Sequence, residues 1–183
     1  MLGILNGDLS EQLTVWHEIA GVMLRCGFLL TLVAGAWQDM RNRKIKVSLI
    51  AMSGTGGAVL RVLYIVLDTA VTYQGGGRQQ LFGLAMGRLM DTVLAMAVGG
   101  GLLFLSRMTK EAVGKGDGWF FLVSGIYLGA MKNLALLAGG LGTCFLLSTV
   151  LMLKGIIQGT DMGKLRIPFL PFLVPAGIGV MFI

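Results

Sequence analysis

The sequence predicts an all-α membrane protein with about six transmembrane helices and with both termini on the outer side of the membrane. Composition is the first indication, because 55% of the 183 residues are apolar and 13% are charged, a balance that one soluble core cannot bury. The second is a run of twenty residues without a charge, 134–153, since about 20 apolar residues cross the hydrocarbon layer. The third is the distribution of basic residues among the connections.

Six apolar stretches are expected to cross the membrane. They lie near residues 19–37, 47–67, 84–105, 118–131, 134–153 and 167–183. The fourth is short, and only Lys132 and Asn133 separate it from the fifth. Three prolines interrupt the last stretch, so we expect it to enter the membrane irregularly and to become helical late.

The N-terminal segment differs from a signal peptide. Residues 1–18 carry acids, and no base precedes Arg25, whereas a signal peptide begins with a positive region. We therefore expect the first span to be retained, and residues 1–18 are either an interfacial segment or part of that span.

Lysines and arginines are concentrated in every second connection. Ten lie on one face of the predicted arrangement and two on the other: the first group is Arg41, Arg43, Lys44, Lys46, Arg107, Lys110, Lys115, Lys154, Lys164 and Arg166, and the second is Arg78 and Lys132. Because short cytoplasmic loops are enriched in basic residues, the first face is predicted to be the cytoplasmic face of a cell membrane. This orientation also explains the net charge of +6, so the expected partner is the lipid bilayer and not nucleic acid.

Metal and cofactor chemistry is not indicated. Cys26 and Cys144 stand alone within apolar runs, and His17 is the one histidine of the sequence, so these residues form no ligand set. We expect neither a metal nor a cofactor, and the sequence does not indicate an oligomeric state.

Two aspartates occupy equivalent places at the predicted cytoplasmic face. Asp39 ends an apolar run, and the second aspartate precedes one, in a motif that consists of Gly114, Lys115, Gly116 and Asp117. A carboxylate at a membrane boundary is costly and marks a candidate functional site. Two nearby carboxylates share a proton, so one can activate a water while the other donates to a carbonyl. The pattern predicts an aspartyl hydrolase, in which Gly114 and Gly116 allow a sharp backbone turn and, with Lys115, bind or support an extended substrate beside Asp117.

A strip of small residues continues from Asp117 along the next predicted helix. At a period of 3.6 residues, Ser124, Gly125 and Gly129 share one face with that aspartate. Small residues let another helix approach closely within a membrane. Either of two helices could pack against this strip: a neighbouring helix of the same chain or the apolar helix of a substrate.

A second charged group lies deeper in the predicted spans. It comprises Glu18, Arg25, Arg61, Asp68, Arg88 and Asp91. The three arginines stand roughly 20 to 25 Å from the cytoplasmic ends of their spans. Asp91 follows Arg88 by one helical turn, and Glu18 and Asp68 lie at a similar height, so local pairing can neutralise these charges. We expect a structural clamp between the first three spans, with an ion path as the alternative.

Three motifs together resemble those of the type IV prepilin peptidases, a family of intramembrane aspartyl peptidases that includes the archaeal preflagellin peptidases. They are Asp39 with its basic stretch, Gly-Lys-Gly-Asp at 114–117, and Ile-Pro-Phe-Leu-Pro-Phe-Leu at 167–173. The similarity covers residues 28–183. It implies six membrane helices in a single aspartyl peptidase domain, 1–183, with Asp39 and Asp117 as catalytic residues. It also implies a pilin-like precursor as the partner, whose short basic leader is cleaved just before an apolar helix.

The sequence departs from the family pattern in places that bear on the substrate. Ile45-Lys46-Val47 stands where Ile-Pro-Asn is common, Trp119 where a lysine is common, and Leu170 where a glycine is common. The chain also lacks the four-cysteine insertion of members that methylate the new N-terminus. It is therefore expected to be of the short, peptidase-only type.

Two other interpretations stay open. A non-catalytic membrane subunit, such as a scaffold or a small transporter, would use Asp39 and Asp117 only to pair with loop bases. A presenilin-like protease shares Gly-x-Gly-Asp but has Tyr-Asp and Pro-Ala-Leu motifs, where this chain has Gln38-Asp39 and Pro175-Ala176-Gly177.

Overall fold

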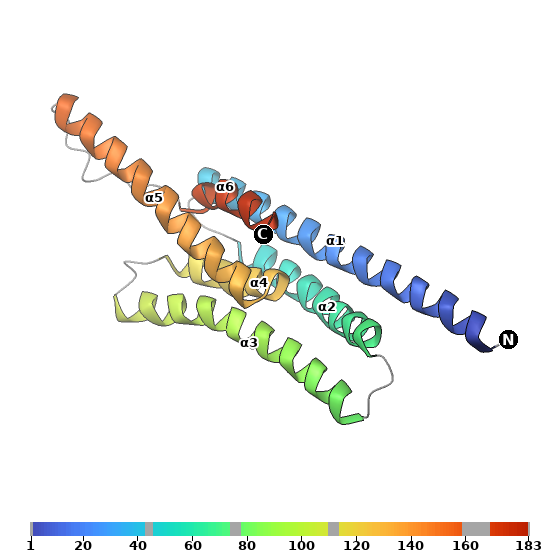
Figure 1. Ribbon diagram of the computed structural model, residues 1–183. Coiled ribbons are helices and arrows are strands. Elements are labelled where there is room, and N and C mark those ends of the chain that lie inside the picture. Colours follow the sequence, from blue (N-terminus) through green and yellow to red (C-terminus); the bar gives the residue numbers. More distant parts are fainter. Residues whose placement is uncertain (1, 43–45, 74–77, 110–113, 159–168, 183) are drawn as a thin grey trace.

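The computed structural model describes residues 2–42, 46–73, 78–109, 114–158 and 169–182, and every regular element within these ranges is a helix. The helices are α1 (Leu2–Asn42), α2 (Val47–Thr72), α3 (Arg78–Met108), α4 (Lys115–Leu128), α5 (Ala130–Gln158) and α6 (Leu170–Met181) (Figure 1). The prediction of an all-α fold is confirmed.

Four helical stretches are long and apolar enough to cross a membrane. They are Ser10–Asn42, Val47–Thr72, Gln80–Met108 and Ala130–Gly155. Their outward side chains are largely apolar, as lipid contact requires; Leu30, Val59 and Phe145, for example, are each at least 70% exposed. The other two helices are shorter: α4 has 14 residues and α6 has 12, or about 21 and 18 Å at 1.5 Å per residue.

Helix boundaries correct the prediction at two places. The first span, predicted at 19–37, is part of one helix that continues without a break through residues 2–18. The break between the fourth and fifth helices lies at Gly129, so its predicted position at Lys132 and Asn133 is wrong. Gly129 has a φ of 80°, a left-handed conformation that ends α4 and that glycine adopts without steric cost.

The last helix begins at Leu170, with Pro171 in its first turn and Pro175 inside it. Proline is tolerated in the first turn because the N–H groups there have no intrahelical acceptor. The irregular entry that was predicted around Pro168 lies outside the described residues.

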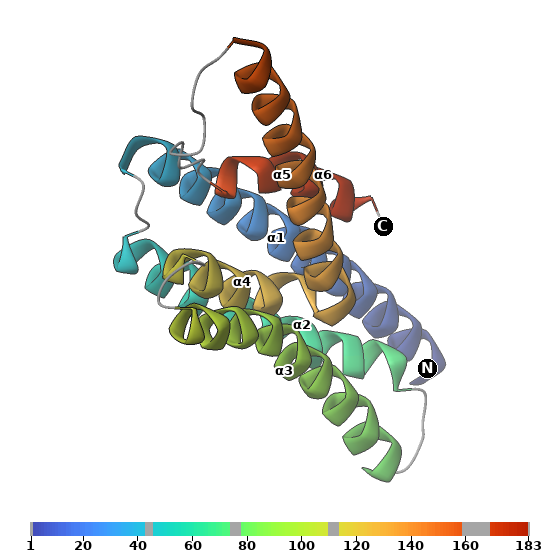
Figure 2. The same cartoon turned by 90° about the vertical axis from the view of Figure 1, so that its left-hand side faces the viewer.

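Successive helices run in alternating directions (Figures 1 and 2). The ends of α1, α3 and α5 and the starts of α2, α4 and α6 therefore lie toward one end of the molecule, which we call the aspartate end because it holds Asp39 and Asp117. Beyond it α5 continues outward, whereas α1, α2 and α3 extend in the opposite direction (Figure 1).

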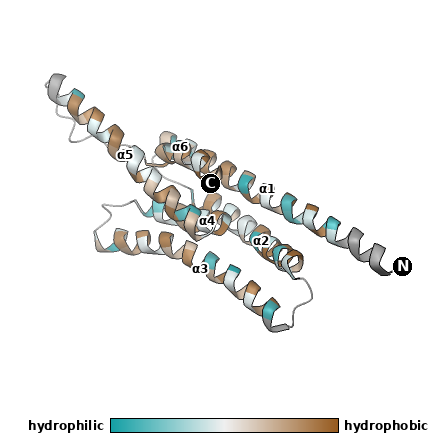
Figure 3. Cartoon of the chain, in the orientation of Figure 1, coloured by the Kyte–Doolittle hydropathy of each residue, from teal (hydrophilic) through white to brown (hydrophobic). Residues whose placement is uncertain are grey.

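The short helix α4 lies at the centre of the bundle, in contact with α1, α2, α3 and α5 (Figure 2). The apolar core around it includes Phe28, Leu32, Phe120, Phe121, Leu136, Leu170 and Leu173, which come from α1, α4, α5 and α6. Hydrophilic positions recur instead along α1 and the first half of α3 (Figure 3). The central position of α4 fixes the location of Asp117 relative to the other helices.

Glycine allows α3 and α4 to pack with their backbones close together. A Cβ added to Gly125 would lie 2.7 Å from the carbonyl carbon of Ala95, and one added to Gly99 would collide with the backbone of Leu122. Such close approach is typical of helix pairs in membranes, where burial of apolar surface gives little drive for association.

Candidate active site at the aspartate end

Asp39 lies in the last turn of α1 and contacts the start of α6. Its Oδ2 accepts a hydrogen bond from the backbone N–H of Leu170, 3.3 Å away. An N–H group in the first turn of a helix has no intrahelical acceptor, and the helix dipole favours a negative charge there. The proline-containing motif and the first aspartate motif, 131 residues apart in sequence, therefore meet in space.

Gly35 lies one helical turn before Asp39 and makes room for this contact. A Cβ at Gly35 would lie 2.9 Å from Leu170 Cδ2 and 3.8 Å from Phe120 Cδ2. The helices α1, α4 and α6 thus converge directly beneath Asp39, on a floor formed by the fully buried Leu170 and Phe120.

Asp117 lies in the first turn of α4. Its backbone N–H donates to the carbonyl oxygen of Gly114, 3.1 Å away, and its side chain is half-buried. A Cβ at Gly114 would lie 2.9 Å from Asp117 Oδ2. Gly114 is therefore suited to this position because any side chain would displace the carboxylate.

The backbone does turn at the two motif glycines, where it enters α4, but this turn does not require glycine. Gly116 lies inside the first turn of α4, and Gly114 has a φ of −61°, which any residue can adopt. Lys115, the first residue of α4, is exposed.

The two aspartates interact electrostatically. The pKa of Asp117 is raised to about 6, chiefly by burial and to a smaller extent by the negative charge of Asp39. Two carboxyl groups coupled in this way lose their protons in steps that belong to the pair. A protonated Asp117 beside an ionised Asp39 would give the site both an acid and a base.

The predicted strip of small residues on α4 is covered by helices of the same chain. Ser124 is buried, and its Oγ donates to Asn133 Oδ1, 2.7 Å away on α5. Asn133 Nδ2 in turn donates to the carbonyl oxygen of Ala95 on α3, at 2.9 Å. Gly125 packs against the α3 backbone, and a Cβ at Gly129 would lie 2.5 Å from Asp91 Oδ2. Ser124, Gly125 and Gly129 therefore support the position of α4 in the bundle.

The second charged group forms an ion-pair layer, which we define as His17, Arg61, Asp68, Arg88 and Asp91. Arg61 Nη2 lies 2.9 Å from Asp91 Oδ2, and Arg88 Nε lies 2.7 Å from Asp68 Oδ2. Both pairs join α2 to α3. Two of the acids that the sequence placed near these arginines, Asp68 and Asp91, do neutralise them, but each pairs with the neighbouring helix, and Arg88 does not pair with Asp91 along their own helix.

Helix α1 reaches the ion-pair layer through a residue that the sequence analysis did not assign to it. His17 Nε2 lies 3.2 Å from Asp68 Oδ1, although the angle does not make a hydrogen bond. The His17 ring also stacks on Tyr64, with 4.8 Å between ring centroids. His17 lies two turns before Arg25 on α1. This spacing was the one feature of the sequence that could have indicated a position of His17 near the ion-pair layer.

Two cavities lie outside the aspartate site. One, of about 240 Å³, is lined by residues around the junction of α4 and α5, including Arg25, Arg61 and Lys132. The other, of about 540 Å³, lies between α3 and α4 and is lined by Phe104, Trp119 and four neighbours. Neither is lined by Asp39 or Asp117.

No protein-family model, curated protein or solved structure matches this chain. Within the described ranges, no group of three or more His, Cys, Asp or Glu side chains is arranged to hold a metal ion. The site that the fold does assemble is a pair of coupled carboxyl groups, Asp39 and Asp117, on a floor of buried apolar side chains. Sequence reasoning missed two supports of this site, the N–H of Leu170 and the space provided by Gly35.

Proposed function

We propose that this protein is an aspartyl endopeptidase of the intramembrane type, which removes the short basic leader from pilin-like precursors. The observation that supports this most directly is the electrostatic coupling of Asp39 and Asp117, which lie 78 positions apart in the sequence. The second support is that Leu170, from the third motif of the resemblance to prepilin peptidases, donates to Asp39.

Peptide hydrolysis follows from the shared proton. The ionised carboxyl group accepts a proton from a water, and the oxygen of that water attacks the carbonyl carbon of the scissile bond. The protonated carboxyl group donates to the carbonyl oxygen, which stabilises the tetrahedral intermediate. The leaving nitrogen then takes a proton as the C–N bond breaks. Because the pair titrates as a unit, the base is the pair and not one named aspartate.

We place the aspartate end at the cytoplasmic face of the cell membrane, because ten of the twelve bases in the predicted connections belong to that face. A single cysteine at Asn42, in a background without Cys26 and Cys144, should resist an impermeant thiol reagent added outside intact cells. A cysteine at Gln80, at the start of α3, should react with it. Labelling of the cysteine at Asn42 but not of the one at Gln80 would show that the aspartate end faces the outside.

Substitution of either aspartate tests the catalytic role. Asp39→Asn and Asp117→Asn each keep the volume of the side chain but remove the shared acid and base, so cleavage of a co-expressed pilin-like precursor should fall by about a thousandfold or more. The double variant should be about as inactive as either single variant, because the two groups act together and their effects do not add. The measurement is the size shift of the precursor on a gel.

A matched control is Glu18→Gln, which changes an exposed acid of α1 in the same way and should leave cleavage intact. Asp161, which lies outside the described residues, gives a second control as Asp161→Asn. Near-normal cleavage by a stably inserted Asp39→Asn or Asp117→Asn variant would exclude the aspartyl mechanism and favour the non-catalytic membrane subunit.

A further inference from the structure

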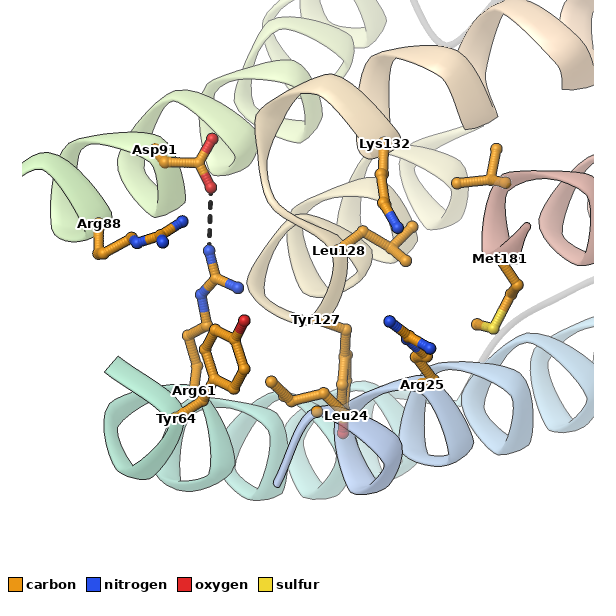
Figure 4. A pocket seen from close by; sticks show the side chains of 12 residues that line it. Leu24, Arg25, Arg61, Tyr64, Arg88, Asp91, Tyr127, Leu128, Lys132 and Met181 are labelled. Carbon is orange, nitrogen blue, oxygen red and sulfur yellow. Dashed lines mark hydrogen bonds and ion pairs between the residues drawn. The ribbon is translucent and has the colours of Figure 1, made fainter. Parts of the chain in front are cut away.

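The cavity at the junction of α4 and α5 is unusually rich in positive charge. Four of its lining residues are basic, Arg25, Arg61, Arg88 and Lys132, and one is acidic, Asp91. They come from α1, α2, α3 and α5, so the charge is gathered by the fold and not by one stretch of sequence (Figure 4).

Two of the four basic groups are neutralised within the protein. Arg61 pairs with Asp91, and Arg88 pairs with Asp68, just outside the cavity lining. In the part of the chain that the structure describes, no ion pair or hydrogen bond joins the head group of Arg25 or Lys132 to another residue. Figure 4 shows these two side chains pointing into the same space from α1 and α5. The cavity therefore has two surplus positive charges.

The position of the cavity makes this surplus costly. Arg25 lies fourteen residues before Asp39 on the continuous helix α1, a distance of about 21 Å. If the aspartate end lies at the membrane surface, the cavity is within the hydrocarbon layer of about 30 Å. Unpaired cations at such depth are unfavourable and are usually matched by a counter-charge.

We propose that this cavity binds a phosphate group, held between Arg25 and Lys132. A phosphate has oxygens on several sides, so it can accept from cations that approach from opposite helices, and its negative charge balances the surplus. Its volume of about 240 Å³ is many times the roughly 10–15 Å³ that one water needs on the same measure, which leaves room for the substituents of a headgroup. The phosphate can come from a phospholipid or from free phosphate in solution.

The test measures binding to the purified full-length chain in detergent, so it does not depend on peptidase activity. Phosphatidylglycerol, diacylglycerol and inorganic phosphate are titrated separately while the thermal unfolding temperature is followed. We expect phosphatidylglycerol to raise this temperature and diacylglycerol, which lacks the phosphate, not to do so. An equal rise with inorganic phosphate alone would identify free phosphate as the ligand, and a rise only with the lipid would identify the headgroup.

The variant Arg25→Gln/Lys132→Gln should weaken phosphate binding by about tenfold or more, as expected for the loss of charge-assisted hydrogen bonds. The matched control is Arg41→Gln/Lys154→Gln, which removes two exposed bases from the same helices outside the cavity and should bind as the unmodified chain does. Should the first double variant fail to fold, Arg25→Gln alone, at an exposed position, must still weaken binding. Unchanged affinity in the folded variant, or no rise with either phosphate-bearing probe, would overturn the proposal.

Discussion

The aspartate end and the ion-pair layer deal with charge in opposite ways. In the ion-pair layer each acid contacts a base, Asp91 with Arg61 and Asp68 with Arg88. At the aspartate end two acids lie near each other without a paired base: burial, and to a smaller extent the charge of Asp39, raise the pKa of Asp117 to about 6. Opposite charges in contact join helices, whereas two acids close enough to raise each other's pKa favour the retention of a proton that can be transferred.

The hydrogen bonds of their carboxylates do not distinguish the ion-pair layer from the aspartate end. Asp91 Oδ1 accepts from the N–H of Ala130 at the start of α5, 3.1 Å away, just as Asp39 accepts from Leu170 at the start of α6. Both carboxylates thus use a free N–H group at a helix N-terminus. What differs is the presence of Arg61 beside Asp91. The comparison therefore predicts that neutralising an acid has opposite consequences for stability in the two regions.

The largest effect is expected for Asp91→Asn, in the ion-pair layer. Arg61 is only 8% exposed, so removing its counter-charge leaves a buried cation unpaired and should lower the free energy of unfolding by about 3 kcal/mol. The measurement is denaturant unfolding of the purified protein in detergent micelles. Glu18→Gln, at an exposed acid of α1, should change this free energy by less than about 0.5 kcal/mol. Equal stabilities of the two variants would show that the Arg61 pair does not hold the helices together.

A smaller effect of opposite sign is expected for Asp117→Asn. Because the folded protein raises the pKa of this group from 3.8 to about 6, the carboxyl group favours the folded state below pH 3.8, and this contribution is lost as the pH rises through about 6. A rise of this size corresponds to about 3 kcal/mol at pH 7 to 8, and because the side chain is only half-buried, solvent screening lowers the expected cost to the folded state to about 2 kcal/mol. The variant should therefore be more stable than the unmodified protein at pH 7 and should show a flatter pH dependence between 4 and 7. A variant that is less stable at pH 7 would contradict the raised pKa.

Much of the fold was available from the sequence because membrane helices follow from local composition. The apolar runs predicted six helices, and six are present in the described residues. The α4–α5 break was misplaced because polarity at Lys132 and Asn133 suggested a loop. Asn133 is instead fully buried and bonded to Ala95 and Phe121 on two other helices. Side-chain polarity cannot distinguish a loop residue from a buried residue whose partners lie elsewhere in the chain.

The candidate site was predictable in part for the same reason. Asp39 and Asp117 were recognisable because a carboxylate at the edge of an apolar run is locally unusual. The contact of Leu170 with Asp39 and the pairing of Arg88 with Asp68 depend on how distant helices dock. The sequence offered Arg88 both Asp91, one turn away on its own helix, and Asp68 at a similar height on another span, and the docking of α2 against α3 selected Asp68.

The smallest effect concerns the coupling between the two aspartates. Burial is the larger cause of the raised pKa of Asp117, and the charge of Asp39 is the smaller one. In Asp39→Asn the pKa of Asp117 should therefore fall from about 6 but should stay above 3.8, because burial still disfavours the ionised form. Titration of Asp117 can be isolated by subtracting the stability of Asp39→Asn/Asp117→Asn from that of Asp39→Asn at each pH, since the two variants differ only at residue 117. A midpoint that stays near 6 would mean that the two carboxyl groups do not share a proton, and the aspartate end would then resemble two separate buried acids.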